Sequence, residues 1–197
     1  MVIYNSIALL GFRGTGKSSV GAVLAQKIGW EFVELDLLIQ TKTGQSIAEL
    51  TKNGTSWDKF RDIESQLIVD SLNKQKLVIS CGGGVGVNNQ NGNLQQHLLQ
   101  SYSNCLKILL RANQLVIKER LLQDFRKLDS NHRVSLQGEI ETEETFWSNN
   151  LQTLNKRQAL YEDQTVFKFD SSTDSVKTIA DKIITQFKYE LLPANSD

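Results

Sequence analysis

The stretch from Gly11 to Ser18, Gly-Phe-Arg-Gly-Thr-Gly-Lys-Ser, constrains this chain more than any other. It matches Gly-x-x-x-x-Gly-Lys-Ser/Thr, the phosphate-binding P-loop, which follows a strand and opens a helix. An apolar, strand-like run over 6–10 precedes it, and 19–28 has apolar residues at helical spacing. A chance match in a glycine-rich turn is the alternative, but it leaves these flanking patterns unexplained. The motif therefore predicts a nucleoside triphosphate site, without saying which reaction follows.

The residue types of the motif suit a polyphosphate. Glycines let backbone N–H groups approach the phosphates closely, and the N-terminus of the following helix adds partial positive charge. Lys17 would reach the β- and γ-phosphates, and the hydroxyl of Ser18 would ligate Mg²⁺. We therefore expect a nucleotide and a magnesium ion at this loop.

The rest of the sequence predicts a single α/β domain over residues 1–197. Strand-like runs alternate with helical patterns, which is typical of a parallel sheet with helices on both faces. We expect a three-layer αβα fold with a five-stranded parallel sheet. The expected strands lie near 6–10, 31–35, 77–80, 105–110 and 166–169. The expected long helices cover 19–28, 57–72, 146–161 and a segment that begins after 174.

Charge and hydropathy narrow the range of partners. The chain has 22 basic and 22 acidic residues, so no net positive field favours a nucleic acid. No apolar run reaches the ~20 residues of a membrane span, and no signal peptide is recognisable, so we expect a cytoplasmic protein without a membrane partner. Cys81 and Cys105 lie in apolar runs without metal-ligand spacing, which predicts reduced core thiols rather than a disulfide.

One segment breaks the alternation of strands and helices. Residues 124–142 are polar with little periodicity. Such a long unpatterned loop in a compact domain is usually functional or disordered, and in a nucleotide-binding enzyme it is a candidate for a mobile lid. Residues 191–197 are expected to form a loose tail.

Two acidic residues end the second expected strand. Strand alternation places Glu34 and Asp36 on the same side, at the carboxyl edge where open α/β sheets bind ligands. A solvated helix cap is the ordinary alternative for such a pair. The pair indicates a metal or substrate site only in combination with the phosphate loop.

Basic residues and glycines form the other candidates. Arg61 and Glu64 are neighbours at i, i+3 on one expected helix, and Gly82–Gly84 exposes backbone after the third strand. Arg133 falls in the candidate lid, and Arg157 continues the apolar stripe of the helix that follows. The ordinary alternatives are a surface ion pair, a flexible turn and a solvated arginine. These residues also become informative only beside the phosphate loop.

Taken in order, these motifs resemble the shikimate kinase family. The order is Gly-Phe-Arg-Gly-Thr-Gly-Lys-Ser, Glu-Leu-Asp, Phe-Arg-Asp-Ile-Glu, Gly-Gly-Gly, an arginine in the lid, and Lys-Arg-Gln-Ala-Leu-Tyr. The resemblance spans roughly residues 5–187, and the ordered set is far more specific than any one motif. It implies a nucleoside-monophosphate-kinase-like fold and transfer of the ATP γ-phosphoryl group to the 3-hydroxyl of shikimate, in aromatic amino acid biosynthesis. We also expect a monomer.

The resemblance implies a role for each charged residue. Lys17, Asp36 and Arg133 would be catalytic: Lys17 on the phosphates, Asp36 at the accepting hydroxyl, and Arg133 closing over the phosphates with the lid. Ser18 and Glu34 would hold Mg²⁺, Glu34 through water. This division of labour suits phosphoryl transfer, which depends on positioning and charge neutralisation rather than on covalent catalysis.

The resemblance also implies the ligand contacts. ATP would contact Gly11, Arg13, Gly14, Thr15, Gly16, Lys17, Ser18, Ser19 and Arg120. Shikimate would contact Asp36, Arg61, Gly82, Gly83, Gly84 and Arg157. Arg120 would stack on adenine, with the loop over 171–174 on the other side of the base. Arg61 and Arg157 would clamp the substrate carboxylate, a use that suits the bidentate guanidinium group.

The sequence departs from the family pattern at three places. Glu34 stands where the first acid of the pair is usually Asp, and Val134 stands where Pro usually follows the lid arginine. Two extra-looking residues, near Trp57 and Asp58, precede the arginine of the Phe-Arg motif. None of these changes removes a charged group that the reaction needs.

Three other functions stay open at this point. A related small-metabolite kinase, such as a gluconate kinase, would share the phosphate loop, but the acid pair, the two clamp arginines and the glycine triplet favour shikimate. A shikimate-kinase-like ligand-binding domain without turnover would lack Lys17, Asp36 or a clamp arginine, and all of these are present. A scaffold that only binds nucleotide would leave the arginines and glycines unexplained.

Overall fold

The computed structural model describes residues 2–52, 57–85, 102–127, 142–165, 167–191 and 193. Its centre is a five-stranded sheet in the order β2-β3-β1-β4-β5, in which every pairing is parallel. The strands are β1 Ser6–Leu10, β2 Glu31–Glu34, β3 Leu77–Ser80, β4 Cys105–Arg111 and β5 Phe167–Asp170. The predicted α/β class and five-stranded parallel sheet are confirmed.

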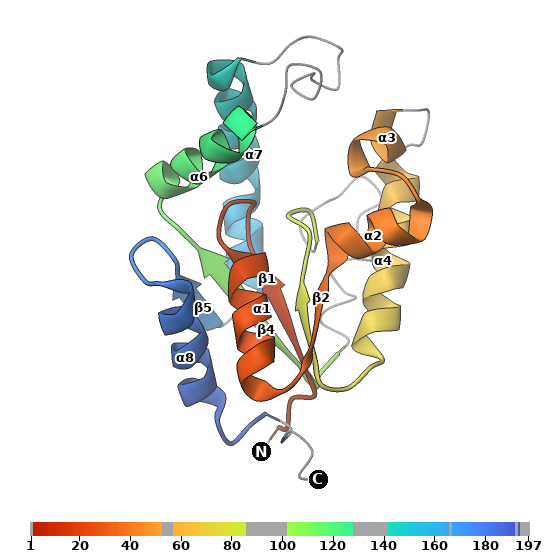
Figure 1. Ribbon diagram of the computed structural model, residues 1–197, viewed down its shortest axis with the longest axis vertical. Coiled ribbons are helices and arrows are strands. Elements are labelled where there is room, and N and C mark those ends of the chain that lie inside the picture. The colour runs from red at the N-terminus through yellow and green to blue at the C-terminus, as the bar shows by residue number, and fades with distance from the viewer. Residues whose placement is uncertain are drawn as a thin grey trace.

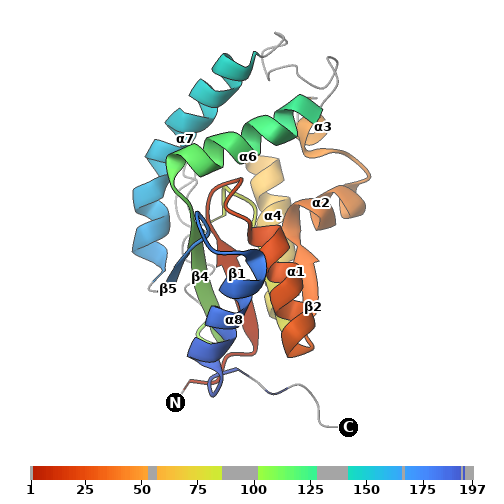
Figure 2. The ribbon, with the colours of Figure 1, turned by 60° about the vertical axis from the view of Figure 1, so that its left-hand side comes forward.

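Helices cover both faces of this sheet (Figure 1). They are α1 Lys17–Ile28, α2 Leu35–Thr43, α3 Ile47–Lys52, α4 Trp57–Leu72, α6 Gln114–Lys127, α7 Glu143–Gln164 and α8 Val176–Phe187. α1 and α8 pack side by side on one face (Figure 2). At the carboxyl edge of the sheet, α6 and α7 lie to one side and α2, α3 and α4 lie to the other (Figure 1).

The central strand β1 is buried on both faces. All of its residues are buried, which is why its sequence is a continuous apolar run rather than an alternating one. Ile7 and Leu9 belong to the core under α1 and α8, whereas Ala8 and Leu10 belong to the core formed with α2, α3 and α4. β1 pairs with β3 on one side and β4 on the other, so the strand order reverses here. The carboxyl end of β1 is therefore the place where such sheets bind ligands.

Local capping sets where two helices begin or end. Gly29 ends α1 in the left-handed conformation, with a φ of 68°. The helix predicted over 146–161 extends over Glu143–Gln164. It begins earlier because Thr142 and Thr145 exchange hydrogen bonds as a capping box, a signal that the apolar periodicity does not contain.

The predicted lid lies mostly outside the described residues. Its first four residues, up to Lys127, continue α6 rather than forming a loop, and its last residue, Thr142, caps α7. The remaining positions, 128–141, are not described, and Arg133 and Val134 are among them. At the start of the predicted tail, Leu191 forms an isolated bridge with Tyr4.

Both cysteines are free and buried, so the prediction of reduced core thiols is confirmed. Burial raises the pKa of the Cys81 and Cys105 thiols, which keeps both in the unreactive thiol form. Across the described ranges, none of the helices combines the length and the apolar character needed to cross a bilayer.

Candidate active site

The phosphate loop connects the carboxyl end of β1 to α1. Gly11, Gly14 and Gly16 have φ angles of 135°, 79° and 85°, which residues with a side chain rarely adopt. A Cβ at Gly11 would also collide with the carbonyl oxygen of Leu110. α1 begins at Lys17, and its N-cap is Gly16, which has no side chain to satisfy the N–H groups of the first turn. Those groups remain for an anion.

Lys17 places a buried cation in this loop. Its side chain is almost inaccessible, and its Nζ donates a hydrogen bond to the carbonyl oxygen of Phe12 at 2.9 Å. Burial lowers the pKa of Lys17 to about 8, against the opposing influence of the Asp36 and Glu34 carboxylates. An anion that binds in the loop would therefore stabilise the charged form of Lys17, and the ammonium group would in turn attract the anion.

Three oxygen-bearing side chains meet next to this cation. The hydroxyl of Ser18 donates a hydrogen bond to Glu34 Oε1 at 2.6 Å and lies 3.4 Å from the hydroxyl of Ser80. Glu34 and Ser80 are the last residues of β2 and β3, which end at the same edge of the sheet. Ser18 and Glu34 were predicted from the sequence, but Ser80 was missed, because its only signal was its place at a strand end.

Asp36 lies on a helix rather than on the strand. β2 ends at Glu34 and α2 begins at Leu35, so the prediction that strand alternation puts Glu34 and Asp36 on one side was wrong. The first turn of α2 nevertheless turns Asp36 toward Gly82, where an added Cβ would lie 2.7 Å from Asp36 Oδ1. Burial raises the pKa of Asp36, although the Lys17 ammonium opposes this. The carboxylate is therefore a stronger base than a solvated one.

Arg61 and Glu64 form a buried ion pair. Glu64 is 1% exposed and Arg61 is 16% exposed, so the alternative of a surface pair on α4 is wrong. Gly84 lies against the guanidinium group, where a Cβ would overlap it. At Gly82, an added Cβ would lie 2.9 Å from Glu64 Oε1. A side chain at either position would displace these charged groups from their present places.

α7 reaches the same glycine loop from the other side. Arg157 donates a hydrogen bond to the carbonyl oxygen of Gly83 at 2.7 Å, and the hydroxyl of Tyr161 donates to the same oxygen. The two side chains lie one helical turn apart and so share a face of α7. Burial raises the pKa of Tyr161 to about 12, so the phenol stays a donor. Tyr161 is the last residue of the Lys-Arg-Gln-Ala-Leu-Tyr motif, but no role was predicted for it from the sequence.

The guanidinium of Arg120 connects the phosphate loop to the loop after β5. It donates to the carbonyl oxygen of Gly14 at 3.0 Å, to Ser171 Oγ at 3.0 Å and to the carbonyl oxygen of Ser171 at 2.7 Å. These contacts place Arg120 beside the predicted adenine loop. Stacking on adenine stays a prediction.

A cavity of about 500 Å³ joins most of the predicted nucleotide residues. Its lining includes Arg13, Gly14, Gly16, Lys17, Ser18, Ser19, Glu34, Asp36, Gly83 and Arg120. Ser171 and Asp174 line it as well. Gly11 and Thr15 shape the loop from behind: Thr15 donates to the carbonyl oxygen of Phe12 at 2.7 Å. The structure therefore brings together the predicted residues that it describes, on both sides of Gly83.

Comparisons with known proteins point to one family. The family model described as shikimate kinase matches residues 13–188. A shikimate kinase of Thermodesulfovibrio yellowstonii is 35% identical over 184 residues, which cover 93% of this chain and 95% of that protein. The structure of a shikimate kinase from Acinetobacter baumannii in complex with shikimate matches with a TM-score of 0.73 and 22% identity, over 94% of this chain and 93% of that one.

A gluconokinase from Sinorhizobium meliloti is a more distant structural neighbour. Its TM-score is 0.59 at 20% identity, over 95% of this chain and 94% of that one, which reflects a shared fold. The family match and the similarity along nearly the whole chain show that this protein belongs to the shikimate kinase family of ATP-dependent phosphotransferases.

Proposed function

We propose that this protein phosphorylates the 3-hydroxyl of shikimate with MgATP, and that the residues predicted from the sequence carry out the reaction. One observation supports this assignment most strongly. The backbone of Gly82–Gly84 is approached by Asp36, by the Arg61–Glu64 pair and by Arg157. An acceptor in front of this loop would meet a carboxylate for its hydroxyl group and two guanidinium groups for its own carboxylate.

On the nucleotide side, the chain supplies positive charge and N–H donors. The first turn of α1 faces the phosphates, and Lys17 would exchange its hydrogen bond with Phe12 for one with a β- or γ-phosphate oxygen. Such a preorganised cation stabilises the charge that develops during phosphoryl transfer. Arg13, which lies over the Phe146 ring with its guanidinium carbon 5.4 Å from the centroid, is an additional cation at this loop.

The oxygen atoms of Ser18, Glu34 and Ser80 fit a magnesium ion. Mg²⁺ prefers hard oxygen ligands and usually keeps several waters beside one or two protein ligands and the phosphates. Within the described ranges no group of three or more His, Cys, Asp or Glu forms a metal cage. The ion would neutralise phosphate charge. Glu34, one methylene longer than Asp, already reaches Ser18 at 2.6 Å.

On the acceptor side, Asp36 would orient the hydroxyl and take its proton. Its raised pKa favours proton acceptance, and Lys17 nearby keeps the carboxylate charged. Arg61 and Arg157 would hold the carboxylate of shikimate, while Glu64 fixes the direction of Arg61 and Tyr161 fixes the position of Gly83. The hydroxyl would thus be presented to the γ-phosphate by groups on α2, α4 and α7.

The alternatives explain less of this arrangement. A domain that only binds ligand has no use for the combination of Lys17, Asp36 and two arginines. A gluconate kinase would also need a carboxylate clamp, so acceptor identity rests on the family match. We further propose that the protein works as a monomer in the cytoplasm and that Arg133 closes over the phosphates, as the sequence analysis expects.

A coupled assay of ADP release tests the acceptor directly. With ATP and Mg²⁺ present, we expect shikimate to drive rapid ADP formation, whereas gluconate and buffer without acceptor give only background. The physical reason is that the groups around Gly82–Gly84 must position the acceptor before transfer becomes fast. Faster turnover with gluconate than with shikimate would overturn the proposed substrate.

The carboxylate clamp predicts the effect of Arg157→Ala. This change removes a charge-assisted contact with the substrate while Tyr161 still holds Gly83. We therefore expect kcat/KM for shikimate to fall by an amount that corresponds to a loss of ~2–4 kcal/mol of transition-state stabilisation. The dissociation constant for ATP should hardly change. Arg126→Ala, which breaks an exposed ion pair with Glu143, is the matched control and should leave both values unaltered. If Arg157→Ala instead abolished ATP binding, its assignment to the acceptor would be wrong.

The proposed metal site predicts a strong effect for one substitution of Glu34 and a mild effect for another. Glu34→Gln keeps the size but removes the charge, so the magnesium concentration for half-maximal rate should rise and the rate should fall strongly. Glu34→Asp keeps the charge and should be mild, because Mg²⁺ tolerates an intervening water. Activity measured against Mg²⁺ concentration gives both values. Equal magnesium dependence in Glu34→Gln and the unmodified protein would exclude Glu34 as a metal-site residue.

A further inference from the structure

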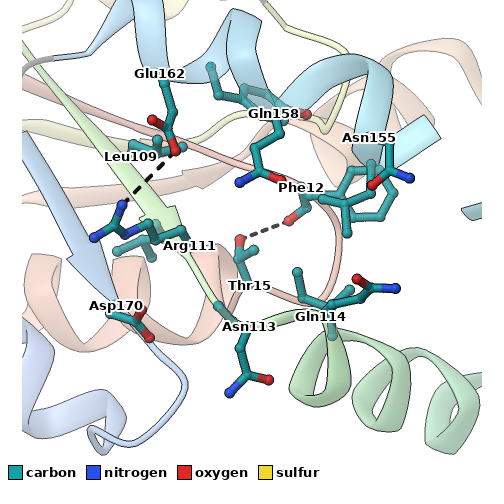
Figure 3. A pocket seen from close by; sticks show the side chains of 15 residues that line it. Phe12, Thr15, Leu109, Arg111, Asn113, Gln114, Asn155, Gln158, Glu162 and Asp170 are labelled. Atoms are coloured by element: carbon teal, nitrogen blue, oxygen red, sulfur yellow. Dashed lines mark hydrogen bonds and ion pairs between the residues drawn. The ribbon is translucent and has the colours of Figure 1, made fainter. Parts of the chain in front are cut away.

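A second cavity, of about 390 Å³, lies behind the phosphate loop (Figure 3). We call it the rear pocket. The carboxyl end of β4, the first turn of α6 and the second half of α7 surround it, and Phe12 and Thr15 of the phosphate loop form one wall. No residue that lines the ATP-side cavity also lines the rear pocket. It is therefore a separate space with its own chemistry, and the proposed function makes no use of it.

The floor of the rear pocket is apolar and its rim is polar. Phe12, Leu109 and Leu154 are buried side chains of the core cluster between α6 and α7, and they form the floor. The carboxamides of Gln114 and Gln158 stand at the rim (Figure 3), and neither forms a side-chain hydrogen bond within the described part of the chain. An apolar surface with a few available polar groups is the usual composition of a small-molecule site.

One end of the rear pocket carries charges of both signs. The guanidinium of Arg111 lies 4.0 Å from Glu162 Oε1, and Asp170 lies on its other side (Figure 3). The side chains of Arg111 and Glu162 are 52% and 37% exposed, and Glu162 also pairs with Lys168, whose Nζ lies 3.5 Å from Oε2. Burial acts to raise the pKa of Asp170, but hydrogen bonds from Ser172 and the nearby Arg111 hold it below its ordinary value, so Asp170 is ionised. Phe12 lies away from this charged end. The pocket is thus charged at one end and apolar at the other.

This distribution selects a zwitterion. A ligand with only a carboxylate would be attracted by Arg111 but repelled by Asp170 and by Glu162, whose charge Lys168 partly offsets. A ligand with only an ammonium group would meet Arg111 as a like charge. A ligand that carries both groups on one carbon satisfies both signs at once. Its side chain would then extend over the apolar floor and bury surface there.

The walls of the rear pocket are hydrogen-bonded to the reaction site. The carbonyl oxygen of Phe12 accepts from Thr15 Oγ1 at 2.7 Å and from Lys17 Nζ at 2.9 Å. Tyr161, another lining residue, donates to the carbonyl oxygen of Gly83. A ligand against Phe12 and Tyr161 would therefore favour some positions of Lys17 and of the glycine loop over others. Differential binding of that kind is what couples two sites.

We propose that the rear pocket binds an α-amino acid with an apolar side chain, and that its occupancy changes the affinity of the protein for ATP. The two charged groups of the ligand pair with Arg111 and with the Glu162 and Asp170 carboxylates, and its side chain covers Phe12 and Leu154. The ATP site and the rear pocket are then two coupled sites on opposite sides of one loop.

Calorimetric titration of the full chain with L-phenylalanine tests the first half of the proposal. We expect a dissociation constant of about 1 mM or below. We also expect at least ~10-fold weaker binding of 3-phenylpropionate, which lacks the ammonium group, and of 2-phenylethylamine, which lacks the carboxylate. No binding of L-phenylalanine, or equal binding of either analogue, would overturn the proposed ligand class. The titration involves no turnover, so its failure is independent of the assigned kinase activity.

Variants place the ligand and test the coupling. Arg111→Gln should weaken L-phenylalanine binding at least ~10-fold while kcat with shikimate and ATP stays unchanged, and the control Arg126→Gln should change neither. If Arg111→Gln bound L-phenylalanine as tightly as the unmodified protein does, the ligand would bind elsewhere and the proposed site would be wrong. Saturating L-phenylalanine should shift the dissociation constant for ATP at least ~5-fold, and this shift should disappear in Arg111→Gln. An unaltered ATP affinity with the pocket occupied would overturn the coupling.

Discussion

The side chain of Lys17 is almost completely buried, and its ammonium group donates a hydrogen bond to the carbonyl oxygen of Phe12. Burial lowers its pKa from 10.5 to about 8, which corresponds to a penalty on the order of 3 kcal/mol for keeping the ammonium group charged in this loop. Phosphate oxygens would remove that penalty where the reaction develops negative charge. The glycine conformations at 11, 14 and 16 and the open first turn of α1 then serve one purpose, which is to bring a polyphosphate to this cation.

The parallel sheet is what brings the other groups to the same place. Because β1, β2 and β3 end at one edge, the phosphate loop, Glu34 and Gly82–Gly84 become neighbours although they are far apart in sequence. α4 and α7 then approach the glycine loop from different sides and deliver Arg61 and Arg157. Glycine at 82 and 84 leaves room for this convergence, since a Cβ there would displace charged side chains.

Most of the site could be predicted because its motifs are local. The sequence alone contains the spacing of glycines and lysine in the phosphate loop. It also contains the helical i, i+3 spacing of Arg61 and Glu64. The burial of that pair could not be predicted, since it depends on packing between α4 and the glycine loop. Asp36 was wrongly predicted to continue a strand. β2 ends at Glu34 and α2 begins at the next residue, so no loop residues in the sequence mark the boundary. Ser80 and Tyr161 were missed because their partners come from other elements.

The pKa of Lys17 in the free protein and with MgATP bound is the most direct test of this account. It can be measured from the Cε chemical shift of labelled lysine against pH, with Lys17→Met to assign the signal. We predict a value near 8 in the free protein, because burial disfavours the charged form, and a value higher by at least about one unit in the complex, because phosphate charge favours it. An ordinary lysine pKa in the free protein, unchanged by MgATP, would contradict the central claim that Lys17 is a buried cation reserved for the phosphates.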